Sequence, residues 1–156
     1  MVTVLVTGYP RDSGKRMEII MANGDVKTCP HSSDYPIEVD DAAGSYANNG
    51  LQLCGGWDGS SSRDKCYKWQ NGTWTETQTL KQARHLHGAS TIGNILWITG
   101  GYNNGRLAST ELVGEDGTVT SGPNLPEARD SHCQVTYQHS TFIIGKCVFS
   151  QYQFNG

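Results

Sequence analysis

One short pattern occurs four times in this chain, and the spacing between the copies limits the folds that the chain can adopt. Each copy is an apolar run that ends in glycine, and the copies span residues 4–8, 51–56, 96–101 and 142–146. Their aligned positions are 8, 56, 101 and 146, so the copies are separated by 48, 45 and 45 residues. A period in this range is typical of folds built from repeated supersecondary units. We therefore predict a repeat architecture.

Tight turns recur in the same frame. A glycine stands sixteen residues after each of the first three aligned positions, in Asn23-Gly24, Asn71-Gly72 and Asp116-Gly117. These dipeptides supply the positive φ angles that a hairpin needs, and a segment of strand character flanks each turn on both sides. No segment of ten or more residues shows uninterrupted helical spacing of its apolar residues. We therefore expect four short antiparallel strands in each complete unit and no helix of normal length.

A shared segment leads into the later units. Residues 80–84 and 125–129 both begin with leucine and end with arginine, and a histidine follows three residues later, at His87 and His132. The first copy reads Tyr35-Pro36-Ile37-Glu38-Val39 at this place, so it has neither the arginine nor the histidine. Because the two histidines recur at one repeat position, we expect them to form structural hydrogen bonds and not to act as ligands or bases.

Several of these features together resemble the kelch repeat. They are a Gly-Gly after an apolar strand, a glutamate in the following strand, a tryptophan after an Asn-Gly turn (Trp74) and a P-x-x-R-x-x-H-like entry to the next unit. The resemblance covers essentially the whole chain, although the first copy has a single glycine and the fourth has Gly145-Lys146. It implies an all-β fold of consecutive four-stranded antiparallel blades of a β-propeller. Kelch-like propellers usually bind proteins, so the resemblance also implies a binding role.

The repeat frame divides the chain into four units. The first, 1–33, would supply the second to fourth strands of a blade, and 34–78 and 79–123 would be complete. The last, 124–156, would supply the first three strands. Because the two ends do not complement each other and propellers close with four to eight blades, we expect a segment of a longer propeller. The alternative is a partial propeller completed by self-association.

Charge and hydropathy exclude two kinds of partner. The formal net charge of −3 gives no basic excess for a nucleic-acid surface. No run of 18 apolar residues is present, so we predict no membrane span. Because the first residues already read as a strand, we expect no secretory signal among them.

The five cysteines bear on the cellular compartment. Cys54 and Cys66 are symmetric about residue 60, in the loop between two expected strands, and Cys133 and Cys147 are symmetric about Ser140. Opposed residues of antiparallel strands approach closely enough for a disulfide, so we predict both bonds and no such partner for Cys29. Disulfides favour an extracellular or secretory-pathway location, with the cytoplasm as the alternative. The sequon Asn71-Gly72-Thr73 is a candidate glycosylation site and points to the same compartment.

The sequence carries no recognisable catalytic motif. Neither a nucleophile elbow nor a phosphate-binding glycine loop is present, and the glycine-rich segments fit turns. The cysteines and histidines lack the spacing of a metal site. We therefore predict a chain without enzymatic activity, metal or cofactor.

The candidate binding residues lie in loops, because loops carry binding more often than strands do. Trp57 and Tyr102 each follow Gly-Gly and lead into a loop, where aromatic side chains can anchor a partner or pack on the neighbouring blade. Polar residues near them could add specificity, and the entry-loop arginines would lie on the same face. The polar candidates are Asp58, Asn103, Arg106, Arg84 and Arg129.

Three classes of function follow. The first is a non-catalytic propeller that binds an unidentified protein through loops on one face. The second is a structural building block of a matrix or filament. The third is a copper radical oxidase of the galactose oxidase type, which carries kelch-like blades. That enzyme needs tyrosine, histidine and cysteine converging on one metal, and the recurring histidines are flanked by no matching set.

Overall fold

The computed structural model of the chain is all-β in the residues that it describes, which are 3–6, 17–20, 25–28, 34–47 and 49–145. They form thirteen strands and no helix, and thus no helix that could span a membrane. The predicted turn at Asn23-Gly24, together with Cys29 and Cys147, lies outside the described residues. The strands are β1 (Thr3–Val6), β2 (Met17–Ile20), β3 (Val26–Thr28), β4 (Ala43–Ala47), β5 (Gly50–Cys54), β6 (Lys65–Gln70), β7 (Thr73–Thr79), β8 (Gly88–Ile92), β9 (Ile95–Thr99), β10 (Thr110–Val113), β11 (Val119–Ser121), β12 (Cys133–Tyr137) and β13 (Ser140–Ile144).

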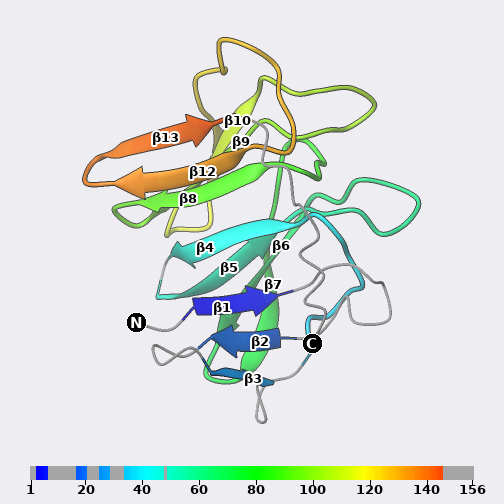
Figure 1. Cartoon of the computed structure of the whole chain (residues 1–156), viewed down its shortest axis with the longest axis vertical. Helices are drawn as coiled ribbons and strands as arrows, with labels where there is room; N and C mark the ends of the chain where they lie inside the picture. Colours follow the sequence, from blue (N-terminus) through cyan, green and yellow to red (C-terminus); the bar gives the residue numbers. More distant parts are fainter. Residues whose placement is uncertain (1–2, 7–16, 21–24, 29–33, 48, 146–156) are drawn as a thin grey trace.

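The strands form four antiparallel sheets, each from consecutive strands. The first sheet is β1-β2-β3, the second β4-β5-β6-β7, the third β8-β9-β10-β11, and the fourth is the hairpin β12-β13. Strand β8 contacts both β4 and β12, so the first strands of successive sheets lie beside one another. Figure 1 shows β12, β8 and β4 following one another, with the first sheet beyond them. The prediction of consecutive four-stranded antiparallel sheets without helices is confirmed for the second and third sheets.

The register of strand pairing repeats from sheet to sheet. Leu5 lies opposite Glu18 and Ile98 opposite Glu111, at the same repeat positions. Leu53, the equivalent of Leu5 and Ile98, lies opposite Tyr67, one position later, because the loop between β5 and β6 is one residue longer. The Asn71-Gly72 turn has φ angles of 53° and 82°, the two positive values that a two-residue hairpin turn requires. The hairpin of the fourth sheet reverses between Tyr137 and Ser140, so Ile144 lies opposite Cys133. The sequence placed the tip of this hairpin at Ser140, and that placement is wrong, because the chain already reverses at Gln138 and His139.

The glycine pairs allow successive units to pack closely. Gly56 N–H donates to the carbonyl oxygen of Arg84 at 2.9 Å, and Gly101 N–H donates to that of Arg129 at 2.8 Å. A Cβ atom at Gly55 would lie 2.5 Å from the first of these oxygens, and the backbone there has a φ of 66°. Glycine is the residue that tolerates both the approach and the positive φ. The Gly-Gly motif is thus where the entry segment of the next unit docks.

A second set of backbone hydrogen bonds joins three units at a constant spacing. Leu86 N–H donates to Asp41 O at 3.0 Å, and Ser131 N–H donates to Leu86 O at 2.8 Å. All three residues have positive φ angles of 50–54°, which is uncommon outside glycine. Because each is 45 residues from the next, these positions mark the same place in successive units.

Two apolar clusters lie on opposite faces of the second sheet. One joins the second and third sheets and contains Ala47, Cys54, Cys66, Leu80, Leu96, Ile98 and Val113. The other is aromatic and contains Tyr35, Val39, Leu53, Tyr67 and Trp74, with the Tyr35 ring edge-on to those of Tyr67 and Trp74. Trp74 is therefore a core residue.

Candidate functional site

The candidate site is a row of three aromatic rings where the second and third sheets meet. Trp57 and Tyr102 follow the two glycine pairs, and His85 lies between them in the entry segment of the third sheet. The centroid of the His85 ring is 5.0 Å from that of Trp57 and 5.6 Å from that of Tyr102. Trp57 and His85 are half-buried, and Tyr102 is 39% exposed. We call Trp57, His85 and Tyr102 the aromatic row.

Backbone pairing explains why these rings converge. Trp57 forms an antiparallel bridge with Asp40, and Tyr102 forms the same bridge with His85, 45 residues later. The Ser62 hydroxyl lies 2.9 Å from His85 Nδ1 and donates to the Tyr102 carbonyl oxygen at 3.2 Å. The repeat backbone therefore holds the two loop aromatics, and Ser62 holds the imidazole between them.

The charge of the His85 imidazole depends on its surroundings. Burial lowers the pKa of His85, while the nearby carboxylates of Asp41 and Asp130 raise it. Burial also raises the pKa of Asp41, and His85 opposes that rise. The net effect lowers the pKa of His85, so its imidazole is neutral at pH 7 although acidic groups lie close to it.

Asp58 orders the loop that follows Trp57. Its Oδ1 accepts hydrogen bonds from the Ser60 and Ser61 N–H groups, both at 2.8 Å, and from the Ser60 hydroxyl at 2.9 Å. These bonds, led by the one from Ser60 N–H, lower the pKa of Asp58 to about 2. Arg63 lies 3.3 Å from its other oxygen. Asp58 therefore shapes the loop beside the aromatic row.

Two of the predicted arginines line one cavity at the junction of the third and fourth sheets. Arg106 and Arg129 lie with Glu127, Ala128, Asp130 and Gly145 around a volume of ≈ 300 Å³. Arg106 Nε donates to Asp130 Oδ2 at 3.3 Å, and its side chain is largely exposed. The Arg129 side chain is half-exposed and lies 3.6 Å from Glu127. Arg106 also forms a backbone bridge with Tyr102, which connects this cavity to the aromatic row.

Asn103 lies in the same loop, between Tyr102 and Arg106. It is half-buried, and its N–H donates to Gly105 O at 2.9 Å. It closes the tip of the loop through its backbone, next to the exposed ring of Tyr102.

Arg84 does not lie on this surface, although the sequence placed it there. Its side chain is 0% exposed and forms a buried ion pair with Glu111, with Nη2 2.7 Å from Oε1. Its Nη1 donates to the carbonyl oxygens of Gly100 and Ser109. Glu111 also accepts the N–H groups of Lys81 and Gln82, at 2.7 and 3.1 Å. The guanidinium group is fully used inside the protein, so Arg84 is a structural residue.

The two recurring histidines are also internal. His87 and His132 are both buried and pack against Gly55 and Gly100 respectively, at the same repeat position. Burial, together with the charge of Arg84, lowers the pKa of His87 to about 3, so its ring is neutral. His132 Nε2 lies 2.9 Å from the Thr99 hydroxyl. His132 thus forms the structural hydrogen bond expected from the recurrence, whereas among the described residues neither buried ring nitrogen of His87 has a hydrogen-bond partner.

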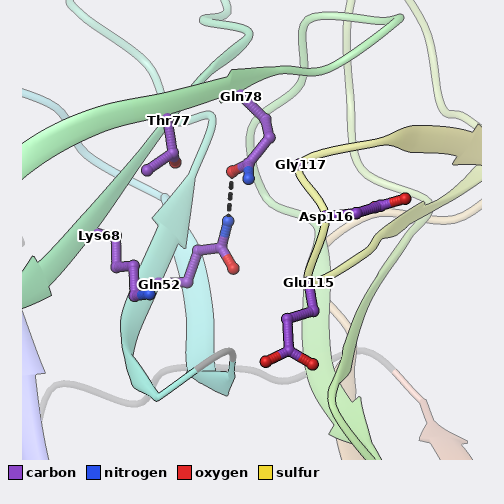
Figure 2. A pocket seen from close by; sticks show the side chains of 7 residues that line it. All are labelled: Gln52, Lys68, Thr77, Gln78, Glu115, Asp116 and Gly117. Atoms are coloured by element: carbon purple, nitrogen blue, oxygen red, sulfur yellow. Dashed lines mark hydrogen bonds between the residues drawn. The ribbon is translucent and has the colours of Figure 1, made fainter.

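A second cavity lies elsewhere, and no predicted site residue lines it. It has a volume of ≈ 340 Å³ and lies between strands β5–β7 and the β10–β11 turn; its lining is Gln52, Lys68, Thr77, Gln78, Glu115, Asp116 and Gly117. Figure 2 shows the Gln52 and Gln78 amides facing each other, joined by a hydrogen bond of 2.6 Å from Gln52 Nε2 to Gln78 Oε1. The side chains of Glu115 and Asp116 point away from that pair (Figure 2). Two of the polar side chains that line this cavity are thus hydrogen-bonded to each other.

Of the predicted disulfides and the predicted glycosylation site, only the Cys54–Cys66 disulfide can be compared with the structure. Cys54 and Cys66 are opposed in the register and bonded, as predicted. The Cys133–Cys147 bond stays a prediction, because Cys147 is outside the described residues. Asn71 is exposed in its two-residue turn, and its glycosylation also stays a prediction.

Sequence reasoning missed His85, the middle ring of the row. Its signal was available, since His85 stands 45 residues after Asp40 and 45 before Asp130, at the position that pairs with the loop aromatic. Within the described residues, no three histidine, cysteine or acidic side chains converge as a metal site would require. No family model matches the chain, and no curated protein matches it.

Proposed function

We propose that this chain is a non-catalytic, protein-binding module of the kelch-type β-propeller kind, which contacts its partner through the aromatic row. The observation that carries the proposal is the placement of Trp57 and Tyr102. Both reach the surface from ordered loops and flank His85, and the Arg106–Asp130 pair lies beside them. Aromatic and arginine side chains held in this way are typical of the residues that dominate protein interfaces.

The repeated register and docked glycine pairs support the propeller part of the proposal. Four sheets follow one another with equivalent strand pairing, and each Gly-Gly receives the next entry segment. Consecutive sheets with such contacts are the expected arrangement of propeller blades. The Cys54–Cys66 disulfide supports an extracellular or secretory-pathway location.

The test separates binding from folding. The immobilised chain is exposed to an extracellular protein extract, and the retained proteins are identified and then titrated singly. Trp57→Ala and Tyr102→Ala should each weaken binding of a retained protein by about 1 kcal/mol or more, roughly fivefold, with nearly unchanged melting temperatures. Trp74→Ala should instead cost about 3–5 kcal/mol of stability, because its ring is core.

The matched control is Tyr46→Ala, which removes an exposed ring of β4. Tyr46 pairs with Leu51, at the end of β5 that is remote from the Gly55-Gly56 pair and Trp57. It should change neither binding nor stability. Equal retention by the wild-type chain and by a Trp57→Ala/Tyr102→Ala double variant would rule out the aromatic row as the contact. Unfolding of the loop variants to the extent of Trp74→Ala would show that the loop rings are core.

A further inference from the structure

The fourth sheet has one face that is covered and one that is apolar and open. Gln134 and Thr136 face the third sheet, where both bond to the Ser90 hydroxyl at 2.9 Å. The opposite face carries Val135, Tyr137, Phe142 and Ile144, which are 49%, 66%, 49% and 59% exposed. In the register, Val135 lies opposite Phe142, so the four side chains share one side of the hairpin. We call this side the open face.

The same face is covered in the two preceding sheets. The positions 45 residues before Val135 and Ile144 are Ser90 and Thr99, which are buried beneath the fourth sheet. The positions 90 residues before Tyr137 and Ile144 are Ala47 and Cys54, buried against Leu96 and Ile98 of the third sheet. This face is therefore the surface on which the next sheet packs, wherever a next sheet is described.

The covering surface has a recognisable register. In the third sheet it contains Leu96 and Ile98 of β9, and Ile98 lies opposite Glu111 of β10. The first sheet of this chain has the same register, with Leu5 opposite Glu18. The chain itself thus carries a sheet whose strand pairing matches that of a sheet which covers this face.

We propose that the open face docks the β1–β3 sheet of a second copy of this chain, in a head-to-tail contact. Two observations support this occupant: the contact continues an interface that already joins sheets within the chain, and it buries an apolar face of a kind that monomers rarely expose. Such a contact uses two different surfaces of each copy. It therefore leads to a closed ring or to an open filament, depending on the rotation between copies.

The test uses sedimentation velocity on the whole chain across the micromolar range, without any added partner. The wild-type chain should associate as its concentration rises. Phe142→Asp introduces a charge on the open face, and Leu5→Asp introduces one in the β1–β3 sheet that would dock on this face. Each variant alone should therefore be monomeric. Mixed together, the two variants should form a one-to-one dimer, since each keeps the surface that the other has lost.

Controls keep the outcome interpretable. Tyr46→Asp places a charge on an exposed ring outside the open face and should leave association unchanged. Circular dichroism and thermal melts establish that each variant folds, and Tyr137→Lys and Glu18→Lys replace any that does not. A monomeric wild-type chain at every concentration overturns the proposal. So does association that Leu5→Asp retains and Phe142→Asp loses, because that result indicates pairing of two open faces. Loss of partner binding at the aromatic row would leave this association intact, so the two proposals fail separately.

Discussion

Arg84 and Arg129 occupy the same repeat position, yet one is a buried cross-link and the other a half-exposed loop residue. Both offer their backbone carbonyl to a glycine pair, at nearly equal distances of 2.9 and 2.8 Å. Their side chains differ because Arg84 reaches Glu111 in β10, whereas the carboxylate beside Arg129 is the exposed Glu127. The repeat thus governs the backbone contact, and the available counter-charge decides whether the guanidinium group is buried.

The two sheet junctions differ in the same way. The second and third sheets meet through an apolar cluster that includes the Cys54–Cys66 disulfide. The third and fourth meet through hydroxyl and amide groups, where the Gln134 amide donates to Ser90 and to the Trp97 carbonyl oxygen. One backbone arrangement therefore accommodates both an apolar and a polar contact between sheets.

Replacing each arginine with methionine tests the contrast between Arg84 and Arg129, and we expect it to have the largest effect on stability. Arg84→Met leaves Glu111 buried without its counter-charge and should cost about 3–5 kcal/mol of unfolding free energy. Arg129→Met breaks a surface pair and should cost less than about 1 kcal/mol. Urea denaturation measures both. An Arg84→Met/Glu111→Leu double variant should recover much of the loss, and equal costs for the single variants would contradict the contrast.

Removing the disulfide tests the apolar junction. The register equivalent of Cys54–Cys66 in the third sheet is Thr99 opposite Thr110. A Cys54→Thr/Cys66→Thr variant should lose about 2–4 kcal/mol, because the cross-link restricts the unfolded chain. The urea midpoint of wild type and variant, compared under non-reducing conditions, reports the difference. Unchanged stability would show that the strand pairing alone holds this loop.

The smallest expected effect is a pH dependence, which compares His87 with His132. The folded-state pKa of His87 is about 3, below its ordinary value of 6.5, so the unfolded chain binds more protons between these values. Its stabilising contribution is complete above pH 6.5 and is lost as the pH falls toward 3, by up to about 1.4 kcal/mol per pH unit. His132, whose pKa is lowered mainly by burial, acts in the same direction.

Stability measured between pH 6.5 and pH 4.5 shows this slope, since the contribution of Asp58 is lost mainly at lower pH, between its ordinary pKa of 3.8 and its folded-state pKa of about 2. His87→Asn should flatten the slope more than His132→Asn does. A slope that is unchanged in His87→Asn would assign the acid sensitivity to other groups.

Local sequence signals predicted the parts of the fold that local geometry determines. The Asn71-Gly72 turn, the strand order within each sheet and the Cys54–Cys66 pairing all follow from the spacing of a few residues. The burial of Arg84 did not follow, because its partner Glu111 is 27 residues away and reads as part of an ordinary strand. The Gln52–Gln78 pair was missed for the same reason.

The candidate site was predictable in part. Trp57 and Tyr102 could be placed at loop entrances because each follows a glycine pair. Their convergence on His85 could not, since it depends on how the entry segment of the third sheet lies across the preceding loop. The register of β12 and β13 was also misjudged, because Gln138 takes up a positive φ of 53° and reverses the chain early.

The constant spacing of Asp41, Leu86 and Ser131 has a consequence for insertions and deletions. The loop between β5 and β6 is one residue longer than that between β9 and β10, since the opposed pairs are Cys54 with Cys66 and Thr99 with Thr110. The next hairpin compensates: Leu80 bonds to Asp64, sixteen residues back, whereas Leu125 bonds to Ala108, seventeen back.

The extra residue in the loop between β5 and β6 is thus offset by one residue fewer in the hairpin that follows. The hydrogen-bonded positions Asp41, Leu86 and Ser131 therefore stay 45 residues apart. A single insertion in either loop should be tolerated by reshaping that loop. The same insertion between Arg84 and Leu86 would shift Leu86 out of line with both of its bonded neighbours, so length variation in such repeats should concentrate away from these junctions.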